Sequence, residues 1–259
     1  MGPENGRNNN EVSFFHLQDY ISKIKLTDNT LFHLEETNRN FDDYFKKLSE
    51  VDKNAILYYW IDSLKKEIKY SNAIENNSNA RYLAFDDDVF FETLNISHTR
   101  IKKLHQYITN SNVDSDYRKC DVRVSSIYED GTEDVFWHGA KSEDVKKFMD
   151  DFIQVYKQDT LSSIFSSPFL KSALIHLLFV RVHPFNDGNG RTARMIHNIK
   201  FTQSLNHVYK SNLMVCPLNL SQSILVNKHT YVNILNSIYF DCGGDEQRAA
   251  AGLLPVRYL

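Results

Sequence analysis

Hydrophobic residues occupy nearly every side of a helix drawn through residues 167–182. A helix that is apolar all round is stable in water only when other elements surround it. The run is too short for a membrane span, because His176 interrupts it and Arg181 follows its longest apolar part. The segment therefore predicts a helix in the middle of a soluble bundle.

Amphipathic helical spacing recurs on both sides of this segment. Apolar residues three or four positions apart occur at 41–48, 57–68, 145–156 and 231–238, and a further helix should start near Arg191. The chain has only 9 Gly and 5 Pro against 42% hydrophobic residues, which argues against a β-sandwich with many tight turns. We therefore expect an all-α fold, a helical bundle.

One segment departs from the helical pattern. Side chains alternate from Val122, Asp130-Gly131 follows, and a second extended stretch ends in Val135-Phe136-Trp137. Asp-Gly between two extended runs is typical of a β-hairpin turn. Because an isolated hairpin is marginally stable, this one should lie against the helices.

Charge, cysteine content and the termini narrow the class of protein. The formal net charge of −3 provides no global basic field, so nucleic-acid binding is not expected. Cys120, Cys216 and Cys242 are far apart and odd in number, which favours a reducing compartment. The polar first residues lack the apolar run of a secretory signal. We expect a cytoplasmic protein without a membrane segment, a disordered lead-in at 1–12 and a tail of unassigned role at 241–259.

The segment from His183 to Arg194 concentrates residues that can carry chemistry. Pro184 disfavours helical geometry at His183, so the buried helix should end there. Gly188 and Gly190 permit backbone shapes closed to other residues and lead into the next helix. Backbone N–H groups at such a helix start, reinforced by the helix dipole, form an anion site.

The side chains around this anion site suit phosphate chemistry. Arg191 and Arg194 are three residues apart and project from the same face of the first turn, where two guanidinium groups can bind several phosphate oxygens. Asp187 offers a hard oxygen ligand for Mg²⁺, and the pKa of His183 suits it to accept a hydroxyl proton. Walker A, Rossmann, HExxH and GxSxG patterns are absent. His176, His183 and His197 match no common metal-site spacing.

The segment resembles the Fic family of protein nucleotidyltransferases. The family motif H-x-F-x-[DE]-G-N-G-R-x-x-R is matched at every specified position: His183, Phe185, Asp187, Gly188, Asn189, Gly190, Arg191 and Arg194. The resemblance extends over about residues 55–240, with the hairpin in the place of the family's flap. It implies the Fic fold, with an N-terminal helical region at 13–110 and a core at 111–240.

The resemblance also implies an activity, the transfer of AMP from ATP to a hydroxyl of a target protein, with release of pyrophosphate. His183 would deprotonate the target side chain, and Asp187 would hold Mg²⁺ between the α- and β-phosphates. Phosphates would be bound by Gly188, Asn189, Gly190, Arg191 and Arg194, with Arg194 on the γ-phosphate. Phe185 would be a buried anchor of the loop. Gly190 stands where the related Doc-type kinases have Lys, which favours nucleotidyl over phosphoryl transfer.

The resemblance assigns further contacts outside the loop. Asn227 and Tyr231 would lie around the adenine, although Val232 stands where many relatives have a second Tyr. The flap residues Val124, Ser125, Ser126 and Ile127 would dock the target segment.

Residues 71–76 match a second motif of the family. The inhibitory pattern [ST]-x-x-x-E-[GN] is met by Ser71, Glu75 and Asn76, upstream of the core. Alone, this stretch would be taken for an ordinary helix end. Ser71 and Glu75 are four residues apart and hence on one helix face. A Glu75 carboxylate in a bidentate pair with Arg194 would occupy the charge meant for the γ-phosphate.

Three functions remain open from the sequence. The first is a protein adenylyltransferase autoinhibited by Glu75, acting on Ser, Thr or Tyr of a target protein. The second is the reverse reaction, a protein deadenylylase, in which Glu75 would help to position water. The third is a non-catalytic helical interaction module. The target protein and the oligomeric state, a homodimer included, are not readable from the sequence.

Overall fold

The computed structural model describes residues 26–48, 50–75, 95–111, 114–127, 131–158, 167–211, 213 and 216–240. The helices are α2 (Asp28–Leu48), α3 (Lys53–Ile74), α5 (His98–Thr109), α6 (Val145–Lys157), α7 (Pro168–Val182), α8 (Asn189–Tyr209), α9 (Leu220–Val226) and α10 (Lys228–Phe240). The strands are β1 (Arg123–Ile127) and β2 (Glu133–His138). The expected all-α bundle with a small hairpin is confirmed. The expected lead-in at 1–12 and tail at 241–259 lie outside the described residues.

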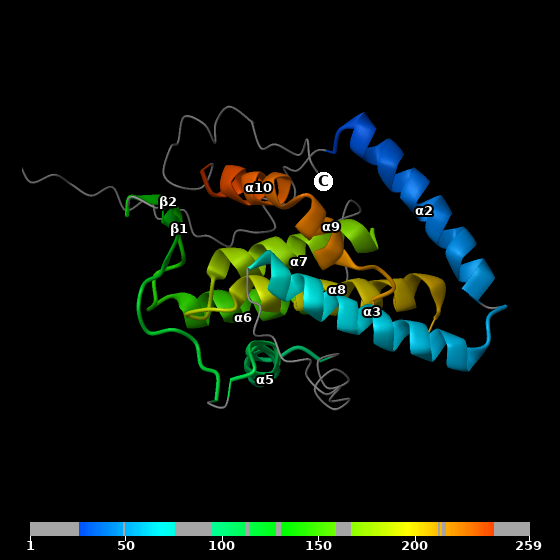
Figure 1. Cartoon of the computed structure of the whole chain (residues 1–259), viewed down its shortest axis with the longest axis horizontal. Coiled ribbons are helices and arrows are strands. Elements are labelled where there is room, and N and C mark those ends of the chain that lie inside the picture. The colour runs from blue at the N-terminus through cyan, green and yellow to red at the C-terminus, as the bar shows by residue number, and fades with distance from the viewer. Residues whose placement is uncertain are drawn as a thin grey trace, which may run out of the picture.

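The apolar segment forms the central helix α7, which packs along α8 (Figure 1). Pro168 is its first residue, a position where proline's missing N–H costs nothing. Ile175, Phe179 and Val182 are completely buried. α6 covers α7, while α5 covers α8. The two helices that bracket the His183–Arg194 segment are therefore held on several sides.

α3 and α2 complete the bundle on the N-terminal side. α3 contacts α8 and α9. α2 adds a second small core, in which Phe41 meets the ring edges of Phe169 and Phe201, with centroids 5.1 and 5.9 Å away. Near the carboxyl end of α3, Ser71 Oγ accepts a hydrogen bond from Arg194 near the start of α8.

The hairpin joins β1 and β2 in antiparallel register, with Arg123 opposite His138 and Ile127 opposite Glu133. The register shifts between Val124 and Ser125, so β2 carries one extra residue there. Gly131 has φ of 81°, a value that a turn glycine adopts easily, while Asp130 lies outside the described residues. β2 contacts α10, and the hairpin lies at one end of the bundle (Figure 1).

Two helices went unpredicted from the sequence, α5 and the seven-residue α9. Ile101, Leu104 and Ile108 give α5 a buried face at helical spacing, so a signal was present. None of the helices in the described part of the chain has both the length and the hydropathy that a membrane crossing requires.

Candidate active site

The turn between α7 and α8 takes its shape from two residues with left-handed backbone. His183 ends α7 with φ of 51° and donates its N–H to Phe179 O over 3.1 Å. Gly188 precedes α8 with φ of 73°, and a Cβ there would lie 2.5 Å from Thr109 Cγ2. Glycine at 188 is therefore needed both for the backbone angle and for the approach of α5.

Hydrogen bonds within the loop hold it closed. The Asn189 amide accepts from Phe185 N–H (2.9 Å) and donates to Phe185 O (2.8 Å). Phe185 is 1% exposed and stacks on His105 with centroids 3.7 Å apart, so the expected buried anchor is confirmed. The Asn189 side chain thus binds the loop itself, which leaves its backbone N–H, among the first of α8, to meet an anion.

The first turn of α8 carries two buried guanidinium groups. The Arg191 and Arg194 side chains are 6% and 2% exposed. The first N–H groups of a helix have no acceptor within it, and the helix dipole adds positive potential there. Desolvated arginines next to such N–H groups suit a polyphosphate.

A carboxylate from the residue that follows α3 occupies this positive site. Glu75 Oε1 accepts a hydrogen bond from Arg194 Nη2 over 2.8 Å, and Glu75 Oε2 lies 2.8 Å from Arg191 Nε. The expected bidentate pair with Arg194 is wrong in this detail, because the carboxylate divides between two arginines. The Arg191 Nε–H is not aligned for a hydrogen bond to Glu75 and has no other partner among the described residues.

Ser71 binds the Arg194 guanidinium directly. Arg194 Nε donates to Ser71 Oγ (2.8 Å), and Arg194 Nη2 also donates to Ser71 O (2.9 Å). A serine one turn before Glu75 therefore orients the guanidinium that the carboxylate meets. Asn76, the third residue of the motif, lies outside the described residues.

Gly190 makes room for this carboxylate. A Cβ at position 190 would lie 2.7 Å from Glu75 Oε1 and 3.0 Å from Arg194 Nη1. The second glycine of the loop is thus required for close approach of an acidic group to α8, whether that group is a carboxylate or a phosphate.

Asp187 is the carboxylate expected to hold Mg²⁺. Its side chain is 86% exposed, and Arg191 Nη2 donates to its Oδ2 over 3.0 Å. The described residues contain no cluster of three or more His, Cys, Asp or Glu that could hold a metal. A single open carboxylate suits Mg²⁺, which commonly keeps several waters and binds one or two carboxylates together with substrate phosphates.

The His183 ring is arranged to act as a base. Its Nδ1 lies 3.2 Å from Val180 O, an acceptor only, so Nδ1 carries the proton and Nε2 keeps a lone pair. Burial lowers the pKa of His183 to about 4, with a smaller lowering from the charge of Arg118. The ring is therefore neutral near pH 7.

Asn227 and Tyr231 lie one turn apart at the start of α10. Asn227 is exposed, and its Nδ2 donates to Ser223 O over 3.1 Å. The Tyr231 hydroxyl is 2.9 Å from His176 Nε2, and its neighbours include Arg194. The Tyr231 hydroxyl is thus buried beside His176 and Arg194, whereas Asn227 lies on the surface.

The base of the hairpin reaches the catalytic loop. Gly139 N–H donates to Val122 O over 3.0 Å and closes the hairpin. A Cβ at Gly139 would lie 3.4 Å from His183 Cβ, so the two segments are in close contact. The flap residues Val124, Ser125, Ser126 and Ile127 all belong to β1.

Sequence reasoning missed three residues that hold this site together. His105 Nε2 meets Asp187 O at 2.8 Å, and its Nδ1 meets Ser115 Oγ at 2.7 Å. Glu67 is buried on α3 and accepts from Ser221 N–H at the start of α9, which fixes the helix that carries Ser71. Arg118 binds the backbone of the loop. These contacts join segments far apart in the chain, and no local spacing signals them.

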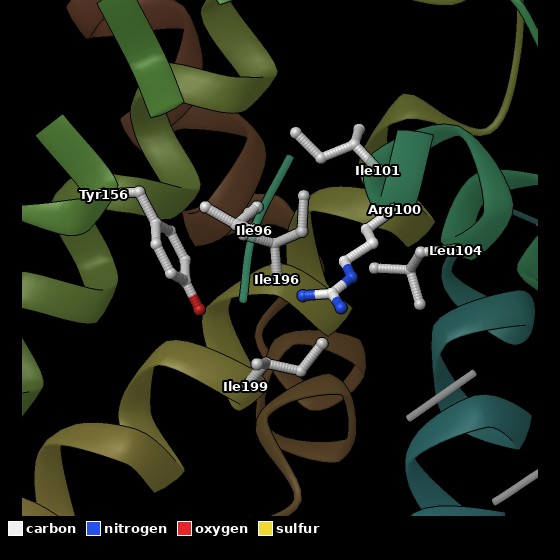
Figure 2. Close-up of a pocket in the computed structure, with 7 residues that line it drawn as sticks. All are labelled: Ile96, Arg100, Ile101, Leu104, Tyr156, Ile196 and Ile199. Carbon is white, nitrogen blue, oxygen red and sulfur yellow. The ribbon is translucent and has the colours of Figure 1, made fainter. Parts of the chain in front are cut away.

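A small pocket opens between α5 and α8. Figure 2 shows its lining, which is Ile96, Arg100, Ile101, Leu104, Tyr156, Ile196 and Ile199. These α8 residues project from a different face than Arg191 and Arg194. The lining is mostly aliphatic and shares no residue with the His183–Arg194 segment.

Buried neutral histidines predict a loss of stability in mild acid. Burial lowers the pKa of His176 to about 3 and that of His197 to about 4. Below about pH 6.5 the unfolded chain binds protons that the folded chain does not, so the free energy of unfolding should fall by up to about 1.4 kcal/mol per pH unit for each such proton. Urea unfolding between pH 7.5 and 5 measures this slope. His197→Phe should reduce the slope by the contribution of one proton. An unchanged slope would contradict a buried neutral His197.

Comparison with known proteins finds a similar family and similar solved structures. Residues 95–199 match the model of the Fic/DOC family. A Fic family protein from Desulfovibrio desulfuricans G20 aligns with a TM-score of 0.59 and 18% identity over 87% of this chain and 69% of that protein. A Fic-domain-containing signaling protein from Bacteroides thetaiotaomicron VPI-5482 aligns with a TM-score of 0.56 and 22% identity, over 85% of this chain and 90% of that protein. At these identities the likeness concerns the fold. The similarity to the Fic/DOC family model covers residues 95–199, the part of the chain that holds the hairpin, the loop and the first half of α8.

Proposed function

We propose that the protein is an adenylyltransferase that moves AMP from ATP to a Ser, Thr or Tyr hydroxyl of a target protein. One observation carries this proposal: a neutral histidine, whose Nδ1 contacts Val180 O, stands before a helix start that carries two buried arginines. Positioning and charge neutralisation are the main requirements of phosphoryl-type transfer, and this arrangement provides both.

In the proposed reaction the target oxygen attacks the α-phosphorus. The bond from the α-phosphorus to the bridging oxygen breaks, pyrophosphate leaves, and the hydroxyl proton passes to His183 Nε2. The N–H groups at the start of α8 and the guanidinium of Arg191 bind phosphate oxygens, while Arg194 binds the γ-phosphate. Asp187 would hold Mg²⁺, which supplies further charge neutralisation on the phosphates.

Glu75 would hold the enzyme in an inactive state. Its carboxylate contacts both arginines at 2.8 Å and so takes the place of phosphate oxygens. ATP can then bind only with its γ-phosphate displaced from Arg194. Release of Glu75, by substitution or by movement of the end of α3, would permit the productive pose.

Mass spectrometry of cell-lysate proteins tests the proposed function. The Glu75→Gly protein is incubated with lysate and ATP, and AMP adducts are sought on Ser, Thr and Tyr. The Glu75→Gly/His183→Ala protein is the matched control. Adducts that depend on His183 are expected. Absence of adducts would contradict the proposal, whereas AMP removal from a modified target by wild type and not by Glu75→Gly would assign the reverse reaction.

The outer edge of β1 is the proposed docking site for the target. β2 contacts α10, and the described sheet has two strands, so no described strand pairs with the other edge of β1. An extended target segment could add there by main-chain hydrogen bonds, which demand little of the target sequence. Its hydroxyl would then lie near His183, which contacts the base of the hairpin.

Proline substitutions on β1 test the docking prediction. Neighbouring residues of an edge strand direct their N–H groups alternately to the paired strand and outward. Ser125→Pro and Ser126→Pro therefore form a matched pair, in which one removes a hairpin donor and the other an outward donor. The outward variant should lose target modification and keep ATP binding and self-modification. Wild-type target kinetics in both variants would contradict docking on this edge.

A further inference from the structure

Arg118 is buried in a segment that is neither helix nor strand. The residue is 3% exposed and its side chain 0%. A buried guanidinium must satisfy its donors, and Arg118 does so with main-chain carbonyl groups. Nε donates to His183 O (2.7 Å) and Nη1 to Cys120 O (2.8 Å), while Nη2 donates to Ala140 O and, over 3.4 Å, to Val182 O.

These carbonyls belong to the end of α7 and to the two ends of the hairpin. Val182 and His183 end α7, where the last carbonyls of a helix lack N–H donors within it. The main-chain N–H of Arg118 also donates to the next carbonyl, that of Pro184, over 2.9 Å. Cys120 precedes β1 and Ala140 follows β2, so the same side chain holds both ends of the flap.

The nearest carboxylate, that of Asp121, does not draw the Arg118 guanidinium away from these carbonyls. Asp121 Oδ1 lies 4.0 Å from Nη1, but that oxygen accepts a hydrogen bond from Ser142 N–H over 2.7 Å. A cation at the carboxyl end of a helix is favourable, because the free carbonyls carry partial negative charge. Arg118 therefore completes the end of α7 at the residue whose ring is the proposed base.

His183 needs such support because of its backbone. A histidine at φ of 51° lies in the left-handed region, where a side chain is disfavoured unless surrounding contacts hold it. The Arg118 side chain donates to the carbonyl that precedes the His183 amide nitrogen, that of Val182, and to the carbonyl of His183 itself. The position of the imidazole thus depends on the same guanidinium that holds the flap.

We propose that Arg118 is a positioning residue that fixes the His183 imidazole relative to the flap, so that a target segment docked on β1 presents its hydroxyl to Nε2. This inference rests on the proposed AMP transfer. Lysine cannot replace arginine here, because its single nitrogen cannot reach carbonyls on opposite sides as the guanidinium fork does.

Steady-state kinetics in the Glu75→Gly background test this inference. Arg118→Lys keeps the charge and removes the fork, Arg118→Met removes both, and Lys119→Met removes an exposed neighbouring cation as the control. Both Arg118 variants should lower kcat for target modification at least tenfold with ATP affinity unchanged, whereas Lys119→Met should match the parent. Unchanged kcat, or a loss of ATP affinity equal to the loss in kcat, would overturn the inference.

Gly139→Ala tests the same junction without altering Arg118. The added Cβ would lie 3.0 Å from Arg118 Nη2 and 3.4 Å from His183 Cβ. This variant should also lower kcat for the target and spare ATP binding, which covers the case in which an Arg118 variant fails to fold. Parental kcat in Gly139→Ala would contradict a shared junction.

NMR titration of His183 separates this inference from the proposed function. Loss of the Arg118 charge in Arg118→Met should raise the pKa of His183, and Lys119→Met should leave it unchanged. This readout needs no activity, so it tests Arg118 even if the Glu75→Gly protein transfers no AMP. A His183 titration that is the same in Arg118→Met and in the parent would overturn the inference.

Discussion

Replacing Glu75 by glycine should raise the rate of AMP transfer about a hundredfold. The Glu75 carboxylate contacts Arg194 and Arg191 at 2.8 Å, and its removal frees both guanidinium groups for ATP phosphates. A hundredfold gain corresponds to about 2.7 kcal/mol between the inhibited and competent arrangements. This is within reach of a carboxylate whose side chain is 27% exposed and bridges two buried arginines. The initial rate of label transfer from radioactive ATP measures the gain.

Three further variants test whether the rate gain comes from loss of the Glu75 contact with the arginines. Glu75→Asp should relieve inhibition only in part, since the shorter carboxylate can still approach one guanidinium. Asp62→Asn removes a charge from an exposed ion pair on the same helix and should leave the rate unchanged. Arg194→Ala should not mimic activation, because it removes the γ-phosphate contact together with the inhibitory one. If the Glu75→Gly protein is no faster than wild type, residues 71–76 have no inhibitory role and are an ordinary helix end.

Replacing His183 should lower the AMP-transfer rate by roughly 10²–10⁴ and leave ATP affinity largely intact. The imidazole serves the acceptor hydroxyl, whereas the phosphate contacts come from α8. His183→Asn is the better matched variant than His183→Ala, because asparagine tolerates the left-handed backbone found at this position. Calorimetric titration with ATP and initial rates, both in the Glu75→Gly background, measure the two effects. A near-parental rate in both variants would show that another group takes the proton.

The pH profile of the same protein bears on this role. Because burial lowers the pKa of His183 to about 4, the base is already deprotonated well below neutrality. The rate should therefore stay level from pH 8 to about 5 and fall only nearer pH 4. An acid limb at pH 6.5 would instead indicate a solvated imidazole.

The elements around the loop were predictable because each depends on local pattern. The apolar run ending at Val182 predicts α7, and the Asp-Gly turn predicts the hairpin that the structure forms. The start of α8 at Asn189 lies two residues before the expected position, because Gly188 supplies the left-handed residue from which the helix begins.

The finer geometry of the site could not be predicted, because long-range contacts create it. Glu75 divides between Arg191 and Arg194 only because Gly190 leaves space for its carboxylate. Arg118 binds main-chain carbonyls, which every residue possesses, so no pattern of side chains marks its partners. Packing of distant segments decides both arrangements.

Transfer of label from ATP tests the central claim most directly. Wild type, Glu75→Gly and Glu75→Gly/His183→Ala are each incubated with ATP labelled at the α- or the γ-phosphorus, and protein-bound label is measured. We predict strong transfer of the α-label by Glu75→Gly, little by wild type, almost none by the double variant, and no transfer of the γ-label. Transfer of the γ-label, or equal α-labelling by Glu75→Gly and the double variant, would contradict AMP transfer by His183 under the control of Glu75.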